Sequence, residues 1–343
     1  MPFYLTLLML LLHPFPLWAQ STLSADFDGN GKVEFLDFLA FAQAFGSTES
    51  RFDFNGDSTV NFSDFLSFVQ LYQQANPAPE PEPALKQTLV LTTSAGTRHI
   101  MLIVPEGEFS MGRDDGSDFG GDTPRHTVFL SDYYIDQFEV TNEQFAAFLN
   151  HIGRNYDPEI GEFTPLLTLG IDGVDIAFTT QFEVTSPSRF NRPVVGVTWF
   201  GARAYCRWIE GRLLSEAEWE KAARGTDGRA YPWGDAEPTA QLTNIGNQIG
   251  HSVDVGSYPA GISPYNVHDL VGNVWEWVSD WQDTGYYAIS PETDPQGPEG
   301  GENRGLRGGS WSFGANFARS TFRGWGTPED STNQIGFRCA RDP

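Results

Sequence analysis

The stretch from Tyr231 to the C-terminus most limits the kind of fold that this chain can form. It is dense in glycine, proline, asparagine and tryptophan. Neither the helical period nor the strand period of apolar residues persists for long within it. The sequence therefore predicts a loop-rich domain whose shape depends on bound metal ions or on disulfide bonds.

The overall composition indicates the size of the core and the kind of partner. The chain has 343 residues, of which 40% are hydrophobic, so one large domain and one small domain are expected. The formal net charge is -24 at pH 7. Nucleic acids and anionic membrane surfaces attract clusters of lysine and arginine, so this charge argues against both as partners. It suits divalent cations and keeps an exported protein soluble.

Residues 1–19 have the pattern of a secretory signal peptide. An apolar run from Phe3 to Leu12 is followed by two prolines and by Ala19, a suitable cleavage position. The run is shorter than the roughly 20 apolar residues that span a bilayer, so no membrane span is expected. The alternative is an ordinary buried segment. We favour the signal peptide because polar sequence begins at Gln20, and we expect a secreted or periplasmic protein.

Cys206 and Cys339 are the only cysteines. In an exported protein an isolated pair most simply forms one disulfide, which here would close a long loop. Two free, buried thiols are the alternative, and they are less common outside the cytoplasm.

Two copies of an acidic pattern follow the N-terminal segment, since Asp26–Asp37 is echoed by Asp53–Asp64. Each copy places oxygen-bearing side chains at loop positions 1, 3, 5, 9 and 12, a spacing that surrounds one point. Calcium binds six to eight oxygen ligands, so each loop is expected to hold one ion. The expected ligands are Asp26, Asp28, Asn30, Lys32, Glu34 and Asp37 in the first copy, and Asp53, Asn55, Asp57, Thr59, Asn61 and Asp64 in the second.

The two copies differ at position 6 and share an unusual residue at position 12. Gly31 supplies the sharp turn in the first copy, whereas Ser58 in the second predicts a strained or weaker site. Position 12 is aspartate in both, and in this the repeat resembles the calcium loops of dockerin modules, a variant of the EF-hand. The resemblance implies a small all-α module with an extracellular protein partner. Two acidic turns in a solvated tail are the alternative, which a second copy in register disfavours.

The remaining patterns divide the chain and predict its regular elements. Helical spacing of apolar residues predicts a helix after each acidic loop, over residues 35–45 and 62–69. We divide the chain into a signal peptide (1–19), a calcium module (20–74), a linker rich in proline and glutamate (75–86) and one large domain (87–343). In that domain we expect strands at 88–92 and 99–104 and capped helices at 142–150, 199–210 and 216–224.

A series of short motifs runs through the large domain in a fixed order. They are Phe109–Gly112, Tyr134–Asn142, Pro193–Trp199, Arg212–Glu220, Tyr231–Gly234, Gly272–Trp277, Arg307–Trp311 and Gly336–Ala340. In content and order they resemble the sulfatase-modifying-factor family, whose best-known members are formylglycine-generating oxidases. The resemblance implies an α+β domain of the C-type-lectin-like kind, with long loops and bound calcium. It also implies that Cys206 and Cys339 form a structural bridge.

The same resemblance implies two calcium sites in the large domain. At the first, family members use backbone carbonyls, one upstream side chain and one glutamate, and the matching positions are Asp269, Gly272, Val274 and Glu276. The alternative is that Glu276 forms a salt bridge with an arginine. The second site begins at an Asn-Ile pair, here Asn244 and Ile245, and its later ligands fall where this chain has few acidic residues.

Formylglycine-generating oxidases bind Cu(I) through two thiols spaced Cys-x4-Cys after the Gly-Gly-Ser turn. Here those positions hold Phe313 and Ala318. Thiolates select Cu(I) because both are soft, so the replacement argues against copper as a cofactor. Ser310 of the turn is retained and is a weak candidate for catalysis. The histidines that follow the signal peptide are expected to be surface or packing residues. They are His99, His126, His151, His251 and His268.

Three functions are compatible with these patterns. The first is a secreted, calcium-binding family member without the copper site, acting as a binding module for a peptide or glycan or as an enzyme of another chemistry. The second is an oxidase of a peptide or amino-acid side chain, similar to formylglycine-generating or siderophore-peptide-maturing members. The third is a scaffold that displays variable loops, for which the insertion Tyr156–Arg189 is a candidate. The ten tryptophans are expected to pack mainly in the core.

Overall fold

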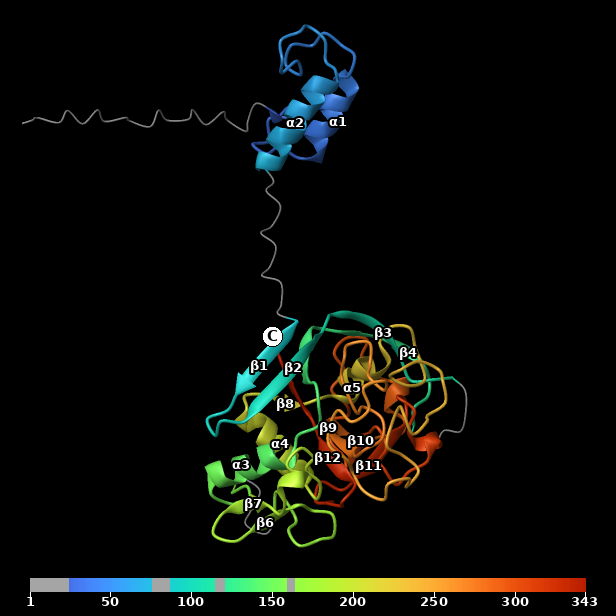
Figure 1. The fold of residues 1–343 in the computed structure, drawn as a ribbon. Coiled ribbons are helices and arrows are strands. Elements are labelled where there is room, and N and C mark those ends of the chain that lie inside the picture. The colour runs from blue at the N-terminus through green and yellow to red at the C-terminus, as the bar shows by residue number, and fades with distance from the viewer. Residues whose placement is uncertain (1–24, 76–86, 115–120, 159–163) are drawn as a thin grey trace, which may run out of the picture. The chain divides into compact units, whose positions relative to one another are not determined.

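The structure is a computed structural model, and it describes residues 25–75, 87–114, 121–158 and 164–343. The chain divides into two compact units, residues 1–84 and residues 85–343 (Figure 1). The expected signal peptide and nearly all of the expected linker lie outside the described residues. None of the helices in the described ranges is long and apolar enough to cross a membrane.

The first unit consists of two helices, each preceded by an acidic loop. The helices are α1 (Phe35–Ala44) and α2 (Phe62–Ala75), and both begin where the repeat predicts. Their inner faces form a small core of aromatic rings, in which Phe41 and Phe68 stack with their centroids 5.4 Å apart. Other apolar side chains of the helices are exposed, namely Phe35, Leu36, Leu39, Phe45, Phe62 and Leu66.

Two sheets form the framework of the second unit. One has five strands in the order β1-β2-β5-β13-β8 and is antiparallel throughout. Its strands are β1 (Thr88–Thr92), β2 (Arg98–Val104), β5 (Tyr133–Asp136), β8 (Arg212–Leu213) and β13 (Cys339–Arg341). The expected strands at 88–92 and 99–104 are its first two strands, which pair from Thr88 opposite Leu102 to Thr92 opposite Arg98.

The other sheet has four strands in the order β11-β10-β9-β12, and β12 runs parallel to β9. Its strands are β9 (Trp275–Trp281), β10 (Arg304–Arg307), β11 (Arg323–Gly326) and β12 (Ile335–Phe337). Figure 1 shows this group apart from the β1–β2 hairpin. No strand period is visible in the sequence of β9, because its first four residues are buried on both faces and its side chains do not alternate between apolar and polar.

The described part of the second unit also contains two hairpins and three short 3₁₀ turns. The hairpins are β3 (Gly107–Met111) with β4 (His126–Leu130), and β6 (Ile176–Phe178) with β7 (Phe182–Val184). The 3₁₀ turns are η2 (Pro187–Arg189), η3 (Tyr286–Ala288) and η4 (Ala315–Phe317). The β6–β7 hairpin lies within the insertion that the sequence suggested as a display loop.

Three helices pack on these strands, each opened by a capping hydroxyl. They are α3 (Asn142–Ile152), α4 (Trp199–Trp208) and α5 (Glu216–Arg224), capped by Thr141, Thr198 and Ser215. The predicted end of α4 at Glu210 is two residues too late. Glu210 has a left-handed φ of 59°, and the N–H of Gly211 turns back to bond the carbonyl of Cys206 at 2.8 Å.

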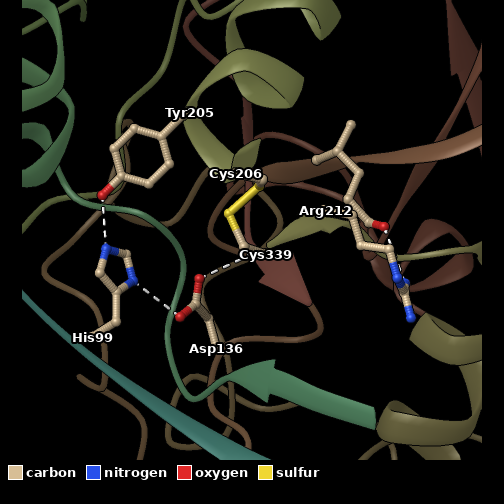
Figure 2. Close-up of a disulfide and its surroundings, with 7 residues drawn as sticks. His99, Asp136, Tyr205, Cys206, Arg212 and Cys339 are labelled. Carbon is tan, nitrogen blue, oxygen red and sulfur yellow. Dashed lines mark hydrogen bonds and ion pairs between the residues drawn. A yellow bond between two sulfur atoms is a disulfide. The ribbon is translucent and has the colours of Figure 1, made fainter. Parts of the chain in front are cut away.

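A disulfide joins helix α4 to strand β13, as Cys206 and Cys339 are bonded to each other (Figure 2). The N–H of Cys339 donates to Asp136 Oδ2 at 3.0 Å. The other oxygen of Asp136 bonds Nδ1 of the buried His99, whose Nε2 bonds the hydroxyl of Tyr205 at 2.7 Å. Both ring nitrogens of His99 are therefore occupied, which makes this histidine a packing residue, as the sequence predicted.

Candidate functional site

The turn that follows β10 determines the position of Ser310. Gly308 and Gly309 have φ angles of 90° and 75°, in the region that favours glycine. A Cβ atom on Gly308 would lie 2.7 Å from the carbonyl oxygen of Leu270, so a larger residue does not fit. The turn places Ser310 in a fully buried position, 0% exposed.

The hydroxyl of Ser310 belongs to a small polar network. It donates to Oε1 of Gln334 at 3.2 Å, and Ser312 donates to the same oxygen at 2.7 Å. A catalytic serine needs a neighbouring base that accepts its proton, and an amide oxygen is too weak a base for this role. The network orients the two hydroxyls but does not activate Ser310 as a nucleophile.

Phe313 lies in an aromatic cluster, and Ala318 packs in another apolar cluster with Tyr231, Ile245 and Val271. The ring centroid of Phe313 is 5.5 Å from that of Trp275 and 5.1 Å from that of Phe317. Phe322 extends the cluster, with its centroid 5.1 Å from that of Phe317. Ala318 is 1% exposed. Apolar side chains occupy this space, and both cysteines of the chain are in the disulfide, so no thiolate is available to a soft metal ion here.

A loop that begins at Asn244 packs against the same segment. The N–H groups of Gly246 and Asn247 donate to the carbonyls of Phe313 and Trp311, both at 2.7 Å. The carbonyl of Asn244 accepts the N–H of Asn273 at 2.9 Å. Asn244 Oδ1 is buried and has no hydrogen-bond partner. A buried oxygen without a partner is costly, and a hard cation would satisfy it, so Asn244 fits the expected role of a calcium ligand. Ile245, the second residue of the expected pair, is buried beside it.

Glu276 is paired with an arginine, the alternative that the sequence left open. Its two oxygens accept Nε and Nη2 of Arg338, both at 2.8 Å, and Oε2 also accepts the indole N–H of Trp219 at 2.9 Å. Arg338 and Glu276 are both buried. The carboxylate therefore has strong partners already, and a cation at Gly272 and Val274 would share it with Arg338.

Two further buried carboxylates lie near Glu276. Asp269 Oδ2 accepts the N–H of Gly256 at 2.6 Å, and burial raises the pKa of Asp269 to about 6. Burial, together with the negative charges of Asp269 and Glu276, raises the pKa of Glu139 well above its usual value. Sequence reasoning missed Glu139, although it lies in the Glu-Val-Thr-Asn motif. The three acidic side chains surround one arginine, and a bound cation here would favour their ionised forms over uptake of a proton.

In the first unit, each acidic loop brings three carboxylates together. Oxygens of Asp26, Asp28 and Asp37 lie within 4.8 Å of one another, and so do those of Asp53, Asp57 and Asp64. Among the residues that the structure describes, no other three of the histidine, cysteine and acidic side chains gather this closely. The remaining predicted ligands lie in the same two loops, namely Asn30, Lys32, Glu34, Asn55, Thr59 and Asn61.

The aspartates at position 12 connect each loop to its helix. Asp37 is fully buried and accepts the N–H of Phe27 at 2.6 Å through Oδ1 and that of Glu34 at 2.8 Å through Oδ2. Asp64 accepts the N–H groups of Phe54 and Asn61 in the same way. The repeated geometry, with oxygens converging on one point, fits a hard divalent cation.

Known proteins share the second unit. The profile of the family described as sulfatase-modifying factor enzyme 1-like domain matches residues 86–343. The formylglycine-generating enzyme of Streptomyces coelicolor is 37% identical over 287 residues, covering 70% of this chain and 88% of that protein. The hercynine oxygenase of Mycolicibacterium smegmatis is 32% identical over 271 residues, covering 72% and 62%. The structure of PvdO from Pseudomonas aeruginosa superposes with a TM-score of 0.61 at 26% identity. The match covers 76% of this chain and 100% of PvdO.

Proposed function

The chain belongs to the sulfatase-modifying factor family, and from this premise we propose that it is an exported, calcium-binding member that lacks the copper-thiolate site and acts by binding a ligand. The observation that carries the proposal is the replacement of both thiol positions, one by Phe313, whose ring packs against Trp275, and the other by the buried Ala318. A Cu(I) site needs soft ligands, and this segment offers rings and hydroxyls instead.

We propose that both units of the molecule bind calcium. In the first unit, each acidic loop would hold one ion through its converging carboxylates, which stand at positions 1, 3 and 12 in the first loop and at positions 1, 5 and 12 in the second. In the second unit, Asn244 Oδ1 and the buried carboxylate of Asp269 are the side chains that fit an ion. Bound calcium would neutralise charge and fix loops that have few regular hydrogen bonds.

A protein partner of the first unit is part of this proposal. Helices α1 and α2 expose matching apolar residues of the repeat, with Phe35 63% and Phe62 62% exposed. Leu39 and Leu66 are matched in the same way. Large apolar side chains exposed at matching positions of both repeats support a docking role of the dockerin kind.

The alternative function is an oxidase that acts on a peptide or amino-acid side chain without the thiol pair. It is favoured by the retained Gly-Gly-Ser turn and by relatives whose names describe oxidative chemistry, the formylglycine-generating enzyme and the hercynine oxygenase. Ser310 would then orient Gln334 rather than attack the substrate, because its buried hydroxyl is bonded to the amide oxygen of Gln334.

Restoring the thiol spacing tests the proposal. The double variant Phe313→Cys, Ala318→Cys is expected to bind about one Cu(I) per chain, whereas the unchanged chain and Phe313→Cys alone bind none tightly. Binding is measured under reducing conditions by competition with a chromogenic Cu(I) chelator. Each protein is also incubated with oxygen and a Cys-x-Pro-x-Arg peptide, and aldehyde formation is followed by mass spectrometry. Tight Cu(I) binding or aldehyde formation by the unchanged chain would refute the proposal.

A further inference from the structure

A polar cavity of about 600 Å³ lies beside the Ser310 segment. Its walls come from residues 170–192, from the loop 250–252, and from Trp311 and Asn333. The insertion contributes Asp172, Asp175 and Arg189, the segment before α4 contributes Arg192, and the loops near the candidate site contribute His251 and Trp311. A cavity of this size matches the volume of typical small-molecule and short-peptide sites.

One of the two arginines in this cavity is already paired. Nη1 of Arg189 lies 3.1 Å from each oxygen of Asp175, and Asp175 is 9% exposed. In this ion pair the carboxylate of Asp175 neutralises the charge of Arg189. Arg189 is therefore not free to bind an incoming group with its full charge.

The other arginine, Arg192, is different. Within the described residues its guanidinium group makes no hydrogen bond and no ion pair. Partial burial and the positive charge of Arg189 lower the pKa of Arg192, and Asp175 and Asp254 oppose this only in part. A guanidinium in such a position is stabilised by an added anion, and its planar shape suits a carboxylate.

The backbone around Arg192 is fixed, so its side chain starts from a rigid base. The carbonyl of Arg192 accepts the N–H of Asn142 at the start of α3, at 2.9 Å. The next residue, Pro193, is buried and forms a bridge with Thr141. A fixed arginine loses less freedom on binding than one on a mobile loop.

Trp311 and two glycines complete the cavity. The backbone of Trp311 is held on both sides, since its N–H donates to Asn273 and its carbonyl accepts from Asn247. Its ring is half-buried and can stack on a flat or apolar group. A Cβ atom on Gly170 would meet nothing within 4 Å, and one on Gly250 would meet only Asn247, at 4.0 Å. Because these two glycines have open space where a side chain would stand, the main chain of a bound peptide can approach them closely.

We propose that this cavity is a subsite for a carboxylate-bearing peptide, with Arg192 pairing to the carboxylate and Trp311 packing against the neighbouring residue. The chain has a net charge of -24 and would repel an acidic ligand over most of its surface, whereas the guanidinium of Arg192 would attract it at this subsite. The inference rests on the proposed ligand-binding function and specifies its ligand.

The test uses the full chain with calcium and three defined probes. The first is an N-acetylated, C-amidated tetrapeptide with one tyrosine and one glutamate, and the second replaces the glutamate by glutamine. The third is a disaccharide that contains glucuronate. Dissociation constants are obtained by ligand-observed NMR titration. We expect the glutamate peptide to bind at least about tenfold more tightly than its glutamine partner, because a charge-assisted bond to arginine is lost in the latter.

Three variants locate the effect. Arg192→Gln is expected to remove the preference for glutamate, and Arg192→Lys to keep part of it through its charge. Arg203→Gln removes an exposed arginine outside the cavity and should leave the preference intact. Thermal melting of each variant checks that it folds, and the lysine variant still reports on the subsite if the glutamine variant does not fold.

Several outcomes overturn the inference. They are equal binding of the two peptides, a glutamate preference that survives Arg192→Gln, and binding of the glucuronate probe without the peptide, which would assign the cavity to acidic sugars. Failure of the proposed function would give a different result from failure of this inference. Aldehyde formation by the unchanged chain in the copper assay would contradict the proposed function while leaving a preference due to Arg192 intact.

Discussion

Three buried arginines, each bonded to a buried glutamate, connect helix α5 and the strands of the second unit. Arg307 pairs with Glu220 at 2.8 Å, and Arg323 pairs with Glu216 at 2.6 Å. Arg338 pairs with Glu276 in the same way. A buried pair of this kind adds modest stability, but removing one partner leaves a buried charge and costs about 3–5 kcal/mol. These residues therefore specify how helices and strands distant in sequence meet.

A buried aspartate in the same region predicts a pH dependence of stability. Burial, with the charge of Glu216 nearby, raises the pKa of Asp280 to about 7. Between about pH 4 and pH 7 the unfolded chain loses this proton while the folded chain keeps it, so stability falls as the pH rises through that window. We expect Asp280→Asn to reduce the loss of unfolding free energy between pH 5 and pH 8 by about 2–3 kcal/mol.

Urea unfolding at both pH values, in saturating calcium, measures this difference. Asp114→Asn is the matched control, because its side chain is 66% exposed and should leave the pH dependence unchanged. A variant Asp280→Asn with the same pH dependence as the unchanged chain would show that Asp280 is ionised in the folded state at neutral pH.

At the scale of elements, the two acidic loops of the first unit can be compared directly. Gly31 and Ser58 both have left-handed backbones at position 6, with φ angles of 88° and 70°. Glycine adopts this conformation freely, whereas serine is strained by about 1 kcal/mol or somewhat more. The sequence predicted a strained turn in the second loop, and the positive φ angle of Ser58 agrees with this prediction.

Exchanging these two residues tests the proposed calcium sites. Ser58→Gly is expected to tighten calcium binding by the second loop about fivefold, because about 1 kcal/mol of strain disappears. Gly31→Ser is the reciprocal variant and should weaken the first loop by a similar factor. Calorimetric titration of the chelator-treated chain gives both constants. Variants with unchanged affinities, or a chain that binds no calcium, would contradict this prediction.

At the scale of the whole molecule, the disulfide joins parts of the second unit that are 133 residues apart in sequence. Cys206 lies in α4 and Cys339 in β13, and both are 0% exposed. The bond thus connects the middle of the chain to its last strand. Such a long loop loses much conformational freedom in the unfolded chain when it is closed.

Removing the disulfide should lower the melting temperature strongly. For the double variant Cys206→Ala, Cys339→Ala we expect a loss of about 4–5 kcal/mol, or about 10 °C or more in Tm. Differential scanning calorimetry in the presence of calcium measures it. A reducing agent should lower the Tm of the unchanged chain by a similar amount and leave the double variant unaffected. Equal melting temperatures of the two proteins would mean that bound calcium and packing hold the unit without the bond.

The sequence alone determined the features that depend on local signals. The helices after each acidic loop, the caps at Thr141, Thr198 and Ser215, and the strain at Ser58 are set by residues a few positions apart. The family motifs likewise located the second unit and the replaced thiol positions, because these depend on residue identity and order.

Only the tertiary structure decided the features that depend on distant residues. It paired Glu276 with Arg338 and brought Glu139 beside Asp269. It also placed Arg192, whose guanidinium has no hydrogen-bond partner among the described residues, in a cavity built from segments far apart in sequence. It also formed the sheet around β9, whose residues carry no alternation because both faces are buried. No local pattern predicts such contacts, because the partners lie far apart along the chain and are selected by packing.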